Sequence, residues 1–200
     1  LSYSGKDIPF SNSPNYFKLY SDTGDIKISR ITINYSCAGA ETDWLGYLGV
    51  EDNGSGATIN RYTPLSAGTR AIVFPNDYHG KPVTSISAGI FKNCMDVNVL
   101  IFPTNPEFTT IPRDFYSTRW GTRVRRIILS DNIKEIGANA FDAEGLYTEV
   151  FIPASVVSIG NRAFTKSSVT FRCEATSQPK GWDSNWYSGQ NITVEWGATR

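Results

Sequence analysis

The sequence predicts a mainly β fold, a right-handed solenoid in which short strands stack coil upon coil. Aromatic residues are abundant, with eleven Phe, ten Tyr and five Trp in 200 residues, and aromatic and β-branched residues favour strands. Four isoleucines recur at intervals of 25, 25 and 23 residues, and an aromatic residue follows each one five positions later. A short strand-like run precedes each isoleucine.

Each repeat combines one strand-like run, one isoleucine and one aromatic residue. The isoleucines are Ile86, Ile111, Ile136 and Ile159, and the aromatic residues are Phe91, Tyr116, Phe141 and Phe164. The strand-like runs are 71–75, 99–103, 126–130 and 150–153, with a fifth at 169–173. One unit cannot bury its apolar face alone, whereas stacked units bury it against each other. This period predicts a leucine-rich-repeat solenoid of about four repeats.

Alternation along the strand-like runs divides their side chains between the core and the outer surface. Two rows are expected inside: Ile72, Leu100, Ile127, Val150 and Phe171, then Phe74, Phe102, Leu129, Ile152 and Cys173. Two rows are expected outside: Val73, Ile101, Ile128, Phe151 and Arg172, flanked by Ala71, Val99, Arg126, Glu149 and Thr170. Gly137 and Gly160 suit the bend that follows the isoleucine.

The two ends of the chain differ from the repeats, which are expected over 55–173. Residues 1–38 alternate like two or three strands, so they either pack on the first repeat or form the tail of a preceding β domain. Residues 39–54 are typical of a linker and turn. Residues 174–200 carry three tryptophans and are expected to cap the solenoid, or to form an aromatic platform. The first residue is not Met, so a processed or partial chain is expected.

Composition argues against several functional classes. Nineteen Lys and Arg balance nineteen Asp and Glu, so no nucleic-acid partner is expected. No run of about 18 apolar residues occurs, so no membrane insertion is expected. Cys37, Cys94 and Cys173 are odd in number and lack metal-ligand spacing. Buried thiols are the favoured interpretation, and a single disulfide is the alternative.

No residue set indicates catalysis. The only histidine, His79, lies in a turn, and nucleophile-elbow, Walker and zinc-protease motifs are absent. The carboxylates Glu135, Asp142 and Glu144 fit solvated positions on or beside the repeats. We therefore expect no enzyme, no catalytic residue, no metal site and no cofactor.

The expected interaction site is the first outward row, which is apolar over four consecutive strands. A contiguous exposed apolar strip generally marks an interaction surface. The candidate residues are Val73, Ile101, Arg126, Ile128, Glu149, Phe151 and Arg172. The alternative is that the N-terminal piece or the segment after Trp182 covers the strip. If it is open, Phe151→Asp should abolish binding and leave the Tm nearly unchanged.

Two repeats resemble a known family closely. The segments 152–164, IPASVVSIGNRAF, and 129–141, LSDNIKEIGANAF, resemble the repeat of BspA-like proteins, the Treponema pallidum type of leucine-rich repeat. Residues 74–94 resemble its first repeat, and 173–197 resemble a segment that often follows the last, so the resemblance covers about 55–197. The second repeat departs from the pattern, with Pro112 in place of Gly and Phe115-Tyr116 in place of Ala-Phe.

The resemblance implies a non-enzymatic adhesion or binding module, secreted or on a bacterial cell surface, that recognises a protein of the host or of a neighbouring cell. One alternative is a carbohydrate-binding accessory module of a larger secreted enzyme. Its platforms would be Trp44, Trp120, Trp182 or Tyr187. A structural spacer in a surface protein is the other alternative.

Overall fold

The computed structural model describes residues 48–63, 70–91, 94, 97–116, 124–142, 148–165 and 168–200. All of them belong to one compact unit, Thr42–Arg200. The segment 1–38 lies outside the described residues, as do Cys37, Trp44, Trp120 and Glu144. The described residues contain strands and turns but no helix, so none of them forms a helix able to cross a membrane.

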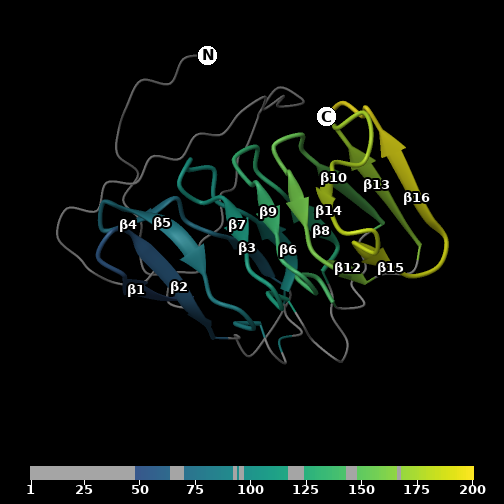
Figure 1. The fold of residues 1–200 in the computed structure, drawn as a ribbon. Coiled ribbons are helices and arrows are strands. Elements are labelled where there is room, and N and C mark those ends of the chain that lie inside the picture. The colour runs from purple at the N-terminus through teal and green to yellow at the C-terminus, as the bar shows by residue number, and fades with distance from the viewer. Residues whose placement is uncertain are drawn as a thin grey trace, which may run out of the picture. The chain divides into compact units, whose positions relative to one another are not determined.

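Short strands form a β-solenoid of about five turns over residues 57–196 (Figure 1). This confirms the predicted fold class. The strands are β1 Leu48–Asp52, β2 Ala57–Tyr62, β3 Arg70–Val73, β4 Asp77–Tyr78, β5 Lys81–Ile86, β6 Val97–Ile101, β7 Thr110–Ile111, β8 Arg126–Ile128, β9 Glu135–Ile136, β10 Glu149–Ile152, β11 Ser158–Ile159, β12 Phe164–Thr165, β13 Val169–Cys173, β14 Gly181–Trp182, β15 Tyr187–Ser188 and β16 Ile192–Trp196.

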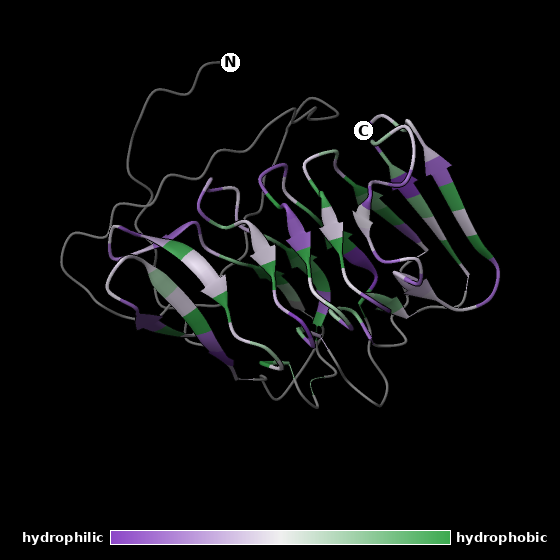
Figure 2. Cartoon of the chain, in the orientation of Figure 1, coloured by the Kyte–Doolittle hydropathy of each residue, from purple (hydrophilic) through white to green (hydrophobic). Residues whose placement is uncertain are grey.

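Two parallel stacks of strands enclose the core. The long-strand sheet contains β3, β6 and β8, and β10, β13 and β16 continue it past a contact between β8 and β10. The short-strand sheet contains β7, β9, β11 and β14, with β5 beside β7. Hydrophobic and hydrophilic residues alternate along the longer strands (Figure 2), as expected where one face of a strand is buried.

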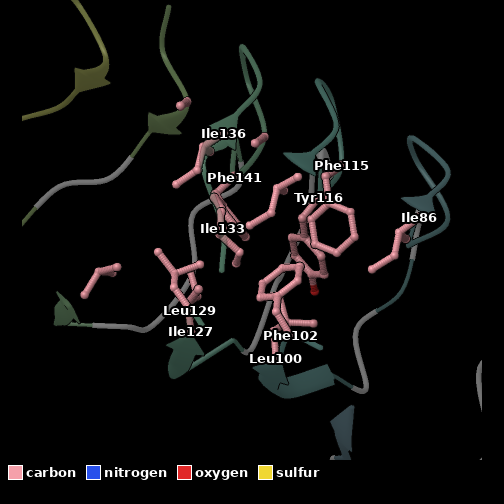
Figure 3. Packing of buried hydrophobic residues seen from close by; sticks show 14 of the residues in the cluster. Ile86, Leu100, Phe102, Phe115, Tyr116, Ile127, Leu129, Ile133, Ile136 and Phe141 are labelled. Carbon is pink, nitrogen blue, oxygen red and sulfur yellow. The ribbon is translucent and has the colours of Figure 1, made fainter. Parts of the chain in front are cut away.

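The isoleucines stand in a column, as predicted. Strand register pairs Ile111 with Ile136 and Ile136 with Ile159. All three are buried, as is Ile86 on the neighbouring coil. The ten side chains expected inside the long-strand sheet are also buried. Figure 3 shows isoleucines of the short-strand side and Leu100 of the long-strand sheet pointing into one aromatic-rich core.

A further internal column escaped the sequence analysis. Val83, Phe108, Ile133 and Val156 are all buried, and they are separated by the same 25, 25 and 23 residues as the isoleucines. Each lies three residues before its isoleucine. The spacing was present in the sequence, but these positions carry three different residue types and so hide the repeat.

The second repeat departs from the pattern because a large ring fills its core. Phe115 stands where the next two coils have the buried Ala140 and Ala163. Its ring centroid lies 5.4 Å from that of Phe102 and 5.8 Å from that of Phe141. Rings at these separations attract one another beyond their area burial. The exchange of Ala for Phe therefore adds an aromatic ring to the core of this coil, and the strands of the coil still pair with those of the next one.

Gly137 and Gly160 are needed for close approach of the coils. A Cβ on Gly160 would lie 2.5 Å from the backbone nitrogen of Ala138, and one on Gly137 would strike the backbone at Arg113. Neither glycine has a positive φ. The sequence predicts that glycine suits a bend after the isoleucine, whereas in the structure it is contact with the adjacent coil that requires glycine at these positions.

Both ends extend the stack of coils. Within the expected linker, the described residues form β1, which pairs antiparallel with β2. Within the expected cap, residues 181–196 form a further coil whose strands pair with β11, β12 and β13. Trp182 continues the isoleucine column in register with Ile159. Trp186 is buried against Phe171, with ring centroids 4.7 Å apart. The end of the solenoid is thus closed by tryptophans that occupy core positions.

Candidate binding face

The seven candidate residues lie on the outward face of the long-strand sheet. Val73 is on β3, Ile101 on β6, Arg126 and Ile128 on β8, Glu149 and Phe151 on β10, and Arg172 on β13. Parallel register pairs Val73 with Ile101 and Ile101 with Ile128. On the other half of the sheet, Phe151 pairs with Arg172. One row therefore crosses the sheet perpendicular to its strands.

The apolar strip, defined here as Val73, Ile101 and Ile128, is open to solvent. Val73 is 48% exposed and Ile128 is 37% exposed, and Ile101 between them is half-buried. Branched side chains are seldom left in a row on a surface without a binding partner. The strip is the apolar part of the candidate face.

A hollow of about 450 Å³ lies beside the strip. Ile101, Ile128 and Pro106 provide apolar walls, and Asp131 and Arg200 provide charged ones. An apolar surface rimmed by a few polar groups suits a side chain of a partner better than it suits water.

The other half of the face is polar because Arg172 is surrounded by partners. Its guanidinium lies 3.7 Å from a Glu149 carboxylate oxygen and 3.5 Å from one of Glu195. It also donates a hydrogen bond of 2.8 Å to the carbonyl of Thr199. Arg172 is therefore charge-compensated and offers little attraction to an anion.

Residues 197–200, called the arm, turn back over the sheet. Gly197 has a φ of +68°, which a residue with a side chain rarely adopts. The amides of Gly197 and Ala198 each donate a hydrogen bond of 2.9 Å, to the carbonyls of Ala175 and Cys173. The arm therefore leaves β16 and crosses the previous strand.

Arg200 ends this crossing above Phe151. Its guanidinium carbon lies 4.9 Å from the centroid of the Phe151 ring. Its nitrogens donate 2.8 Å to the carbonyl of Leu129 and lie 2.8 Å from an Asp131 carboxylate oxygen. Cation–π attraction contributes about 0.5–1 kcal/mol, and an exposed ion pair contributes at most about 1 kcal/mol. The arm thus covers Phe151 and leaves the apolar strip uncovered.

Sequence reasoning did not identify Asp131 or Arg200 as parts of this face. Neither belongs to a row defined by strand alternation. The one local signal is Gly197 after the last strand, which permits a turn but does not say where the following residues go.

The aromatic residues expected to form a platform for a sugar differ in their exposure to solvent. Trp182 is buried and donates its indole N–H, at 3.0 Å, to the carbonyl of Val156, so its ring cannot receive a sugar. Tyr187 and Trp196 are each 36% exposed on the last coil. Trp44 and Trp120 lie outside the described residues.

The other polar candidates have structural roles. His79 is exposed, and it and Gly80 have φ values of 52° and 77°. Two consecutive positive φ angles form the tight turn that joins β4 to β5. Burial raises the pKa of the Cys173 thiol to about 12, so this thiol stays protonated and inert at neutral pH. The described residues hold no group of three or more His, Cys, Asp or Glu arranged to bind a metal.

Comparison with known proteins bears on the repeats. The sequence model of the BspA type leucine rich repeat region matches residues 65–192 with six copies. Six copies exceed the four repeats expected, and the match extends into the last coil, 181–196. The chain gave no significant match to a curated protein or to a solved structure. Since the match spans more than half of the 200 residues, the chain belongs to the BspA-type leucine-rich repeat family.

Proposed function

We propose that the chain is a non-enzymatic module that binds a protein ligand of a host or of a neighbouring cell through the outward face of the long-strand sheet. The observation that carries the proposal is the alignment of Val73, Ile101 and Ile128, which strand register holds side by side and which remain accessible. Leucine-rich repeat modules typically mediate protein binding, and repeat solenoids present extended surfaces suited to that role.

The geometry suits an extended segment of the ligand. Neighbouring strands in a sheet are about 4.8 Å apart, so three strands span roughly 10 Å. A segment that crosses them would place apolar side chains on the strip and in the hollow beside Ile128.

We further propose that the module acts outside a bacterial cell, on the surface or in secreted form. BspA-type proteins are commonly found there. Protease treatment of intact cells should remove the protein if this is correct. A protein that survives such treatment and fractionates with the cytoplasm would contradict this assignment.

The binding face is tested by a matched pair of substitutions. Ile128→Asp places a charge on the strip, and Val157→Asp places the same charge on a side chain that is 56% exposed beside β11. Against a panel of host-matrix proteins, we expect Ile128→Asp to weaken binding at least tenfold, about 1.4 kcal/mol. Val157→Asp should bind like the parent protein.

Thermal unfolding serves as the control for this pair. Both side chains are exposed, so both variants should keep a Tm within about 3 °C of the parent. Equal loss of binding in the two variants, or a large drop in Tm for Ile128→Asp, would contradict the proposed face.

A carbohydrate ligand is the second candidate, favoured by the exposed rings of Tyr187 and Trp196 on the last coil. Aromatic faces stack on apolar sugar faces and leave the polar edges in water. If this function is correct, a glycan array detects binding that Trp196→Ala abolishes and Ile128→Asp does not. If neither the glycan array nor the protein panel detects binding, a role as a structural spacer is favoured.

A further inference from the structure

The arm fills part of the candidate face with a contact of defined chemistry. Arg200 meets three different groups: the ring of Phe151, the carbonyl of Leu129 and the carboxylate of Asp131. These groups come from β10 and from the turn after β8, and they converge on one guanidinium. From this geometry we infer that the face recognises an extended peptide segment carrying an arginine, and that the arm occupies the position of that segment. The inference rests on the proposed function.

The three groups together select arginine. A flat guanidinium can lie over an aromatic face and still direct several N–H donors to acceptors in its own plane. Both acceptors, the Leu129 carbonyl and the Asp131 carboxylate, contact the nitrogen atoms of Arg200. A lysine ammonium could pair with Asp131 but lacks this planar fork.

The hollow beside Arg200 supplies a second point of recognition. It is lined by Ile101 and Ile128 of the strip and by Arg200 itself. Phe151 and Ile101 lie two strands apart, roughly 10 Å, which is about three residues of extended chain. The ligand therefore combines an arginine with an apolar side chain about three positions away.

The arm is held weakly enough to be displaced. Its backbone is attached by three hydrogen bonds, two donated by the amides of Gly197 and Ala198 and one accepted by the carbonyl of Thr199 from Arg172. The Arg200–Asp131 pair lies in solvent, where ions screen it. A ligand arginine has to compete with Arg200 for the same three groups. Removing the Arg200 side chain should therefore raise the affinity for the ligand by about tenfold.

Selection of peptides tests both parts of this inference. Random linear peptides displayed on phage are selected on the full chain carrying Arg200→Ala. The enriched peptides are then labelled, and their Kd values are measured by fluorescence polarisation with the parent protein and four variants. The variants are Arg200→Ala, the double variant Arg200→Ala with Asp131→Asn, Ile128→Asp, and Arg113→Ala. Arg113 is the matched control, because it is an exposed arginine paired at 3.2 Å with Asp114 and lies away from this face.

The inference predicts peptides that contain an arginine with an apolar residue about three positions away. These peptides should bind Arg200→Ala about tenfold more tightly than they bind the parent or Arg113→Ala. The added Asp131→Asn should reverse most of that gain. Peptides that depend on Ile128 but show no arginine and no gain with Arg200→Ala would overturn the inference and leave the proposed function standing. Failure to select any peptide that depends on Ile128 would overturn both.

Discussion

At the scale of single residues, one left-handed position recurs in four successive coils. The residue three after the isoleucine has a positive φ in four successive coils, and these residues are Gly89, Asp114, Asn139 and Arg162. Glycine, asparagine and aspartate tolerate this conformation, whereas a long side chain is strained by it. Arg162 is therefore the least suited of the four.

Replacing Arg162 by a residue that tolerates a positive φ should stabilise the protein. Arg162→Asn keeps the backbone hydrogen bond from residue 162 to the Asn185 carbonyl and relieves part of the strain, so we expect a gain of about 0.5–1 kcal/mol. Urea unfolding measures the change. Lys180→Asn, at an exposed position without a positive φ, is the control and should not gain stability.

The buried thiol of Cys173 makes stability depend on alkaline pH. Burial raises its pKa from 9.0 to about 12. Between these values the unfolded chain loses the thiol proton and the folded chain keeps it, so stability is complete below pH 9.0 and falls as pH rises toward 12. Between pH 8 and about 10.5, we expect Cys173→Ala to lose roughly 1–2 kcal/mol less than the parent. Identical pH profiles from urea unfolding would contradict this.

At the scale of the repeating element, the spacing between coils is set by glycine. Because the backbone of the preceding coil lies 2.5 Å from a Cβ at position 160, Gly160→Ala should cost about 1–3 kcal/mol through overpacking. Gly89→Ala is the comparison, since its Cβ meets nothing within 4 Å and only its φ of +66° is strained. It should cost about 1 kcal/mol. A smaller loss of stability for Gly160→Ala than for Gly89→Ala would show that neighbouring coils can move apart to accommodate the added Cβ.

A row of asparagine side chains links neighbouring coils by hydrogen bonds, after the long strands end. The Asn105 amide donates hydrogen bonds of 2.8 Å to the carbonyl of Asn76 and 3.0 Å to that of Val83, and its side-chain oxygen accepts from the Phe108 amide. Asn132 repeats this pattern by donating to the carbonyls of Asn105 and Phe108. Side chains thus satisfy backbone groups that the short strands leave unpaired.

A negative charge at position 105 should break these hydrogen bonds between coils. Asn105→Asp keeps the shape but replaces two donors by a carboxylate facing carbonyl oxygens, so we expect a loss of about 2–3 kcal/mol in urea unfolding at neutral pH. Lowering the pH should restore part of it, because a protonated carboxyl donates again. Asn191→Asp, at an exposed position, is the control. A similar loss there would assign the effect to charge alone.

At the scale of the whole molecule, the core of each coil packs against the neighbouring coils, and only the arm reaches further, so damage to the core should remain local. Trp186 is buried in the last coil against Phe164 and Phe171. Trp186→Ala should cost about 3–5 kcal/mol and should loosen residues 168–196. Hydrogen exchange is expected to show lost protection there, with residues 97–116 still protected. Uniform loss along the chain would show that the solenoid unfolds as a single unit.

Much of the architecture was predictable because a solenoid repeats local information. Each coil buries the same positions, so the intervals between Ile111, Ile136 and Ile159 predict that these residues form a column. Alternation along β8 likewise places Ile127 inside and Ile128 outside. The column of Val83 and Phe108 was hidden because its residue types vary, although its spacing does not.

The sequence by itself determined the period, the isoleucine column, the two inner rows of the long strands and the family, since each follows from residues a fixed distance apart along the chain. Only the tertiary structure decided which part of the outward row is open. Arg200 lies 71 residues beyond Leu129, yet it donates to the Leu129 carbonyl and covers Phe151. That contact depends on how many coils separate the two residues and on the direction of the turn at Gly197, and neither quantity appears in any local pattern.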